Sequence, residues 1–167
     1  GLKGVKIHPD IQQVNLDDER LFELYDLIAG KIPLYLHMGD DRPQYRYSEA
    51  ERLVRVLKMF PKLEVVAAHL GGYRSWDVSV PLLSGRENVW YDTSSALWAM
   101  SSSDAEKIIS VLGSERIMFG TDYPVVNTHE ELERFYALKL SERQREDILF
   151  NNAVRFLHLE DRVSNAL

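Results

Sequence analysis

The sequence predicts an α/β fold in which five short parallel strands alternate with helices. Apolar runs occupy residues 4–7, 33–36, 64–68, 88–91 and 117–119, and several of them are almost continuously apolar. Strands of a parallel sheet have this character because helices cover both faces of the sheet. Amphipathic stretches separate the runs, and alternation of strand and helix is typical of βα units.

Periodicity and start signals predict several helices between and after the strands. The first is indicated by apolar residues at the i, i+3, i+4 and i+7 spacing, namely Leu21, Leu24, Tyr25 and Ile28. Later helices are indicated by capping-box pairs, which are Ser48 with Glu51, Ser103 with Glu106, Thr128 with Glu131, and Ser141 with Gln144. Gly113 is expected to end a helix. The last helix is expected over residues 143–159, with a break near Asn151.

Composition and charge narrow the class of protein. The chain has 167 residues, of which 45% are hydrophobic and 28% charged, as expected for a single domain over residues 1–167. Its net charge of −6 argues against nucleic-acid binding. The absence of cysteine excludes disulfides and thiolate metal sites and is consistent with a cytoplasmic location. We expect neither a membrane span nor a signal peptide.

Each predicted strand ends on a side chain that can bind a metal or transfer a proton. The five are His8, His37, His69, Asp92 and Asp122, at spacings of 29, 32, 23 and 30 residues. Two architectures fit: an open doubly wound sheet, and part of a (β/α)8 barrel. No GxGxxG or Walker loop follows a strand, which weakens a nucleotide-binding version of the open sheet. In a barrel, the carboxyl ends of the strands surround one pocket, so these side chains would converge.

Side-chain alternation along the strands adds further expectations. If His37 and His69 point into the barrel, Tyr35 and Ala67 should point the same way. Lys6 shares a face with His8, where it could hold an anionic substrate or, when carbamylated, bridge two metals; we favour the first role.

A purely structural role competes with a functional one at several of these residues. His8 serves equally well as a functional group or as part of a His-Pro strand exit. Asp92 precedes a Thr-Ser-Ser run and is expected to cap the next turn rather than to act chemically. His129 and His158 fall in helices and are expected to lie outside the site.

Six motifs in order resemble the amidohydrolase superfamily, and in particular its amidohydrolase-related branch, which includes enzymes like aminocarboxymuconate-semialdehyde decarboxylase. They are "GVKIHP", "LYLHMGD", "VVAAHLGG", "WYDTSS", "MFGTDYP" and "NNAVRFL". The resemblance implies a (β/α)8 TIM barrel and a metal-dependent hydrolase that uses a divalent metal, usually zinc, and a metal-activated water. Within the same family, non-oxidative decarboxylation of a small carboxylate substrate is the alternative reaction.

The resemblance also implies roles for individual residues. His37 would bind the metal. His69 would bind a second metal or handle the proton of the water, and Asp122 would touch the metal and act as general base. Ser94 and Ser95 lie where substrate contacts would come from, and we assign substrate contacts to Lys6, His8, Tyr73, Arg74 and Trp98.

One family feature is missing from the sequence. The His-x-His pair that family members carry at the end of the first barrel strand does not occur here. A barrel takes about 250 residues, so we expect this chain to be the C-terminal portion, about strands 4–8 with their helices. The sequence is also compatible with a noncatalytic fragment, with a homo-oligomer paired through the edge strand at residues 4–7, and with a barrel phosphoesterase.

Overall fold

A computed structural model describes residues 1–160 and contains the predicted parallel sheet. Five strands lie in the order β1-β2-β3-β4-β5, and every neighbouring pair is parallel. Their bounds are Val5–Ile7 (β1), Leu34–Leu36 (β2), Val65–Ala67 (β3), Val89–Asp92 (β4) and Ile117–Met118 (β5). The strands follow the predicted apolar runs, and most are slightly shorter than those runs.

Helices connect the strands, as the alternation of apolar runs and amphipathic stretches predicts. They are α1 (Pro9–Gln12), α2 (Phe22–Ile28), α3 (Ala50–Met59), α4 (Trp76–Leu83), α5 (Ser102–Leu112), α6 (Thr128–Ala137), α7 (Glu142–Glu146) and α8 (Asn152–Phe156). A π-helical segment, Asp147–Asn151, joins α7 to α8 and coincides with the predicted break. Within residues 1–160, no helix combines the length and the apolar character needed to cross a membrane.

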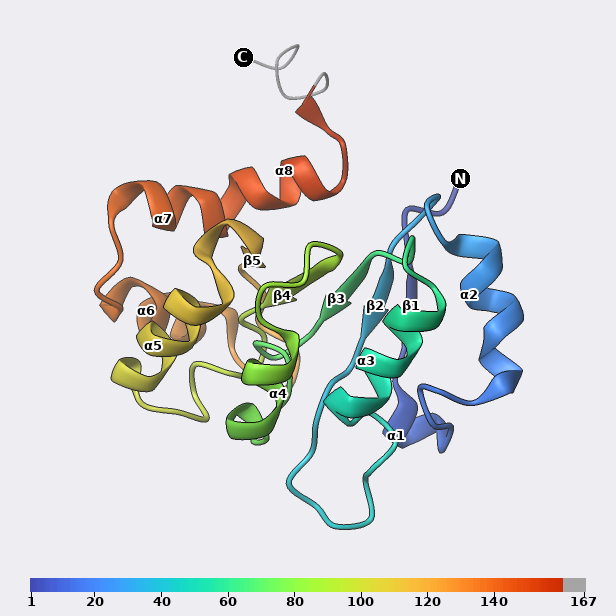
Figure 1. The fold of residues 1–167 in the computed structure, drawn as a ribbon. Helices are drawn as coiled ribbons and strands as arrows, with labels where there is room; N and C mark the ends of the chain where they lie inside the picture. The colour runs from blue at the N-terminus through green and yellow to red at the C-terminus, as the bar shows by residue number, and fades with distance from the viewer. Residues whose placement is uncertain (161–167) are drawn as a thin grey trace.

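The register of the sheet brings the strand ends to one rim. Val5 lies opposite Leu34, Leu34 opposite Val65, and Val65 opposite Val89. Because all five strands run the same way, their carboxyl ends lie at the edge where α1 begins (Figure 1). The long loop between β2 and α3 extends from the same edge. This rim is therefore the place where the predicted site residues should meet.

The main core lies between one face of the sheet and the helices. Alternate strand residues enter it, and the fully buried ones include Leu34, Leu36, Val65, Ala67 and Val89. Helix α3 contributes Leu53, Val56 and Leu57 to the same cluster. Burial of these side chains is the principal stabilising contribution, because each large aliphatic group removed from water contributes about 1.5–3 kcal/mol.

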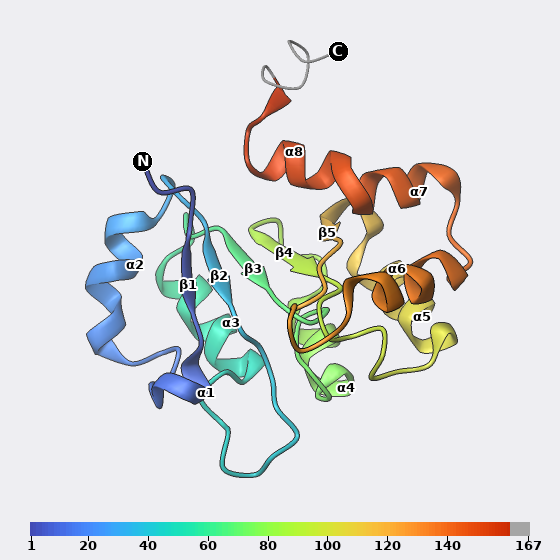
Figure 2. The same ribbon diagram turned by 180° about the vertical axis from the view of Figure 1, so that it is seen from behind.

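The opposite face of the sheet carries a smaller cluster. Val66 and Trp90 pack with Phe156 of α8, and Lys6 places its Nζ 4.3 Å from the centre of the Tyr35 ring. Figure 2 shows this side, with β1 and β2 lying in front of α3. In a closed barrel this face would line the interior.

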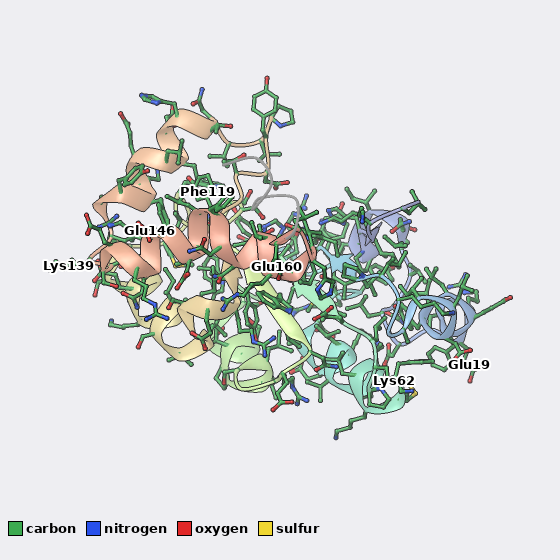
Figure 3. All side chains as sticks on the ribbon, turned by 90° about the horizontal axis from the view of Figure 1, so that it is seen from above. Glu19, Lys62, Phe119, Lys139, Glu146 and Glu160 are labelled. Carbon is green, nitrogen blue, oxygen red and sulfur yellow. The ribbon has the colours of Figure 1, made fainter. Side chains whose placement is uncertain are left out.

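Helices α7 and α8 lie at the end of the molecule opposite to the rim, on the side of the amino ends of the strands (Figures 1 and 2). Figure 3 views this end from above, with Glu146 labelled on α7 and Glu160 just after α8. The buried side chain of Asn152 donates from Nδ2 to the carbonyls of Ser114 and Ile117, at 2.7 and 2.6 Å. This amide attaches α8 to the segment that enters β5.

Helix caps agree with the prediction in part. Ser141 and Gln144 form the predicted capping box, and α5 ends at Leu112, before Gly113. The other predicted pairs are wrong, because neighbouring residues cap the helices: Ser101 caps α5 and Asn127 caps α6. Helix α3 has Glu49 at its N-cap, without a side-chain cap hydrogen bond.

The buried amide of Asn152 leads to a stability prediction. Asn152→Ala should lower the free energy of unfolding by about 1–3 kcal/mol, because the buried carbonyl of Ile117 and the half-buried carbonyl of Ser114 lose their donor. Asn151→Ala is the matched control: that amide is exposed, so its loss should change the value by less than about 0.5 kcal/mol. Urea denaturation of both variants measures the difference, and equal losses would contradict this account of Asn152.

Candidate active site

Three histidines from three separate βα units lie side by side at the rim. The rings of His8 and His37 stack with centroids 3.8 Å apart. The rings of His37 and His69 meet edge to face at 4.8 Å. The convergence predicted from the strand ends is therefore present for these three residues, which are 29 and 32 positions apart in sequence.

Hydrogen bonds determine which ring nitrogens carry protons. His69 Nδ1 lies 2.7 Å from the carbonyl oxygen of Ser94, which can only accept, so Nδ1 must carry the proton. In the neutral ring, Nε2 of His69 is then an acceptor. It lies 2.9 Å from Nδ1 of His37, so that nitrogen donates. The remaining nitrogen of His37, Nε2, therefore presents a lone pair.

The lone pair of His37 faces a carboxylate that no sequence pattern singles out. His37 Nε2 is buried without a hydrogen-bond partner and lies 4.0 Å from Oδ2 of Asp10. His8, Asp10 and His37 each offer a ligand atom, and these atoms lie within 4.8 Å of one another. The signal for Asp10 in the sequence is its place two residues after His8, in "HPD".

The Asp10 side chain is held by the loop that follows β2. The backbone N–H of Tyr47 donates to its Oδ1 at 3.0 Å, and the hydroxyl of Ser48 donates to Oδ2. Ser48 Oγ in turn accepts from the N–H of Gly39 at 3.0 Å. Gly39 has φ +71°, and a Cβ there would lie 2.5 Å from the hydroxyl of Ser75, so glycine is required.

The backbone of His69 is held in an uncommon conformation. His69 and Leu70 have φ of +61° and +53°, in the left-handed region. Asp92 stabilises this turn, because its Oδ1 accepts from the backbone N–H of His69 at 2.9 Å. The same oxygen accepts from the N–H and the hydroxyl of Ser94, so Asp92 is a cap, as predicted.

The left-handed turn overturns one alternation prediction. Ala67 does not share a direction with His69: it is buried in the main core with Leu36, whereas His69 faces His37. Alternation applies only while the backbone stays extended, and it ends at the turn that follows Ala67. Tyr35, by contrast, lies on the face opposite to the main core, as expected.

Asp122 reaches the rim but lies outside the His–Asp–His group. Its carboxylate accepts from the hydroxyl of Ser95 at 2.9 Å, and the residue is exposed. His129 lies on the exposed surface of α6, where it pairs with Glu133, and His158 lies after α8. Neither of these histidines belongs to the cluster of His8, His37 and His69, as expected.

Aromatic and cationic side chains border the histidines. The Tyr73 ring lies 6.1 Å from His69 and 6.3 Å from Trp98. The guanidinium carbon of Arg74 lies 5.4 Å from the centre of the Tyr73 ring and 5.9 Å from that of Trp98. Arg74 also pairs with Asp41 at 3.6 Å. We call Tyr73, Arg74 and Trp98 the aromatic–arginine border.

Burial keeps the histidines neutral. Desolvation, reinforced by the neighbouring His69, lowers the pKa of His37 from 6.5 to about 3. Burial also lowers the pKa of His69 and of His8. Neutral imidazole is the form that binds metal ions. The unpartnered Nε2 of His37 and the adjacent buried carboxylate therefore fit a divalent metal.

Comparisons with known proteins agree with the sequence motifs. The amidohydrolase family model matches residues 1–159. A curated relative, the 2-amino-3-carboxymuconate-6-semialdehyde decarboxylase of Caenorhabditis elegans, is 31% identical over 122 residues. That alignment covers 64% of this chain and 30% of the relative.

Solved structures confirm the fold class. An uncharacterized TIM-barrel protein, Bb4693 of Bordetella bronchiseptica, matches with a TM-score of 0.81 at 27% identity, over 95% of this chain and 58% of that one. The 5-carboxyvanillate decarboxylase of Novosphingobium aromaticivorans, solved with manganese, matches with a TM-score of 0.69 at 20% identity, over 95% and 57%. The five-stranded sheet thus corresponds to part of a (β/α)8 barrel, and the chain spans little more than half the length of these structures.

The low pKa of His37 leads to a pH prediction for the metal-free chain. In the unfolded chain the His37 ring takes up a proton near pH 6.5, whereas in the folded chain it does so only near pH 3. The free energy of unfolding should therefore fall as the pH falls through this window, by at most about 1.4 kcal/mol per pH unit for this residue.

Urea denaturation with a chelator at pH 7, 6 and 5 measures this dependence. His37→Asn should reduce the loss, whereas His129→Asn, at an exposed position, should leave it unchanged. An unaltered pH dependence in the His37 variant would contradict the assignment.

Proposed function

This chain belongs to the amidohydrolase family, and on that premise we propose that it carries out metal-dependent, non-oxidative decarboxylation of a small carboxylate with an unsaturated or aromatic group. The name of the Caenorhabditis elegans relative supports decarboxylation over the hydrolysis expected from sequence. Because the chain covers 30% of that relative, the reaction and its substrate are proposals for the whole protein.

The observation that carries the proposal is the aromatic–arginine border beside His69. Arg74 offers a planar set of donors that matches a carboxylate, and its exposed side chain can turn from Asp41 towards a ligand. Tyr73 and Trp98 offer ring faces for an unsaturated substrate. The border lies next to His69, whose edge-to-face contact with Tyr73 places the two rings 6.1 Å apart.

Decarboxylation requires a carboxylate anchor, an electron sink and a proton donor. The carbon–carbon bond to the carboxylate breaks, carbon dioxide leaves, and the remaining electron pair takes up a proton. We assign that proton to His69 or Asp122, and we assign Arg74, with Lys6 and His8, to binding the substrate. A bound divalent metal would polarise the substrate oxygens and lower the pKa of a bound water.

For the metal of this reaction we retain the ligands implied by the family resemblance, His37, His69 and Asp122. His37 would bind through its unpartnered Nε2, and His69 would have to release its Nε2 from the hydrogen bond with His37 Nδ1 in order to bind. Zinc is our expectation from sequence, and the manganese in the Novosphingobium structure makes manganese an equal candidate. We also propose a cytoplasmic location, a small-molecule substrate and assembly into a homo-oligomer.

Hydrolysis by an activated water is the second candidate. The carboxylate of Asp122, held by Ser95 at the rim, favours it because a general base must reach a water. A panel of esters, lactones and aromatic carboxylates separates the two reactions. Carbon dioxide release from a carboxylate, without ester or lactone cleavage, supports decarboxylation.

His69 provides the first activity prediction. His69→Asn should lower kcat by about 10²–10⁴-fold, because general acid–base catalysis contributes about that much. His129→Asn is the matched control and should retain full activity. Carbon dioxide release under saturating substrate is the measurement. Undiminished kcat in the His69 variant would exclude His69 from proton transfer.

Arg74 provides the second activity prediction. Arg74→Gln should raise KM for a carboxylate substrate about 10-fold or more, because a charged hydrogen bond is lost. Arg20→Gln, at an exposed arginine paired with Asp18, is the control. Steady-state kinetics of both variants test the anchor, and a KM unchanged by Arg74→Gln would assign the carboxylate to another residue.

A further inference from the structure

We infer that His8, Asp10 and His37 form a divalent-cation site, built by the start of α1 after β1 and by the residue that follows β2. It shares His37 with the ligand set proposed above, but it uses neither His69 nor Asp122 as a ligand. The inference goes beyond the proposed reaction, because it concerns cation binding by this chain whether or not the chain is active.

Geometry favours this group over the one implied by the family. Within residues 1–160, it is the His–Asp–His group whose donor atoms all lie within 4.8 Å of one another. Nε2 of His69 already accepts a hydrogen bond from His37, and the carboxylate of Asp122 accepts one from the hydroxyl of Ser95. The lone pair of His37 faces Asp10 instead, at 4.0 Å.

The donors are also positioned before any ion arrives. Asp10 is 1% exposed, and both of its oxygens accept hydrogen bonds from the loop between β2 and α3. His37 is oriented by His69, whose own tautomer is set by Ser94. Such supporting hydrogen bonds are typical of metal ligands, since they hold a ring or a carboxylate in its binding orientation.

His8 is the adjustable member of the group. It stacks on His37, and its Nδ1 accepts only a long hydrogen bond, 3.4 Å, from the N–H of Ile11. That weak bond is easily exchanged for an ion. His8 and Asp10 lie on the same short turn, in which α1 begins at Pro9, so the two ligands from this unit are tied together.

The chemistry of the donors indicates the class of cation. Two neutral imidazoles and one carboxylate suit zinc, cobalt and similar transition-metal ions. Calcium and magnesium prefer sites made of oxygen ligands. We therefore expect Zn²⁺ and Co²⁺ to bind and Ca²⁺ and Mg²⁺ not to compete at similar concentrations. Three protein ligands leave coordination positions for water.

The test is titration of the chelator-treated full chain with Zn²⁺ by calorimetry and with Co²⁺ by visible absorption. We expect one equivalent to bind, with affinity reduced at least 10-fold in Asp10→Asn and in His8→Asn. Asp26→Asn on the exposed surface of α2 and His129→Asn on α6 are the matched controls and should bind as the parent chain does.

A readout on the unaltered chain guards against misfolded variants. Nitrogen-15 spectra of the histidine rings should show Zn²⁺ shifting the signals of His8 and His37, while the Nδ1–H of His69 stays bonded to Ser94. The inference would be overturned if Zn²⁺ did not bind, or if it bound without shifting the nitrogen-15 signals of His8.

The test also separates this site from the one in the proposed function. Binding that survives Asp10→Asn and His8→Asn but is lost in His69→Asn and Asp122→Asn would overturn the inference and leave the proposed ligand set standing. Binding that follows Asp10, in a chain without decarboxylation of any carboxylate in the panel, supports the inference and contradicts the proposed function.

Discussion

The hydrogen bond from His69 to the carbonyl of Ser94 is the interaction on which the rim depends. A carbonyl cannot donate, so this single contact places the proton on Nδ1 of His69 and, through the next ring, on Nδ1 of His37. The lone pair of His37 is thereby aimed at Asp10. One backbone oxygen thus determines which atom of a residue from a different βα unit is free to bind a metal.

Asp92 shows how much structure supports that contact. Burying a charged carboxylate is unfavourable, and burial raises the pKa of Asp92. The hydrogen bonds that Ser94 and the backbone of His69 donate to this carboxylate act in the opposite direction and lower its pKa. The same hydrogen bonds hold His69 in a left-handed conformation that an L-residue rarely adopts. Stability is therefore given up at this strand end to fix the direction of one imidazole, as is common at functional sites.

The sequence predicts the sheet and three of the rim residues because both follow from local pattern: apolar runs set the strands, and parallel strands share an edge. Asp10 could not be predicted in this way, since its hydrogen-bond partners, Tyr47 and Ser48, lie 37 and 38 residues away. The direction of Ala67 is mispredicted because a left-handed turn follows it. Tautomers likewise depend on a contact between His69 and Ser94, 25 positions apart.

The packing of Phe156 on Val66 and Trp90 has a consequence for biosynthesis. Translation proceeds from the amino terminus, so β3 and β4 leave the ribosome well before α8 does. Until residue 156 emerges, that face of the nascent sheet stays uncovered and is open to chaperones or to other chains. Contacts this distant in sequence also slow folding, because a long loop must close before they form.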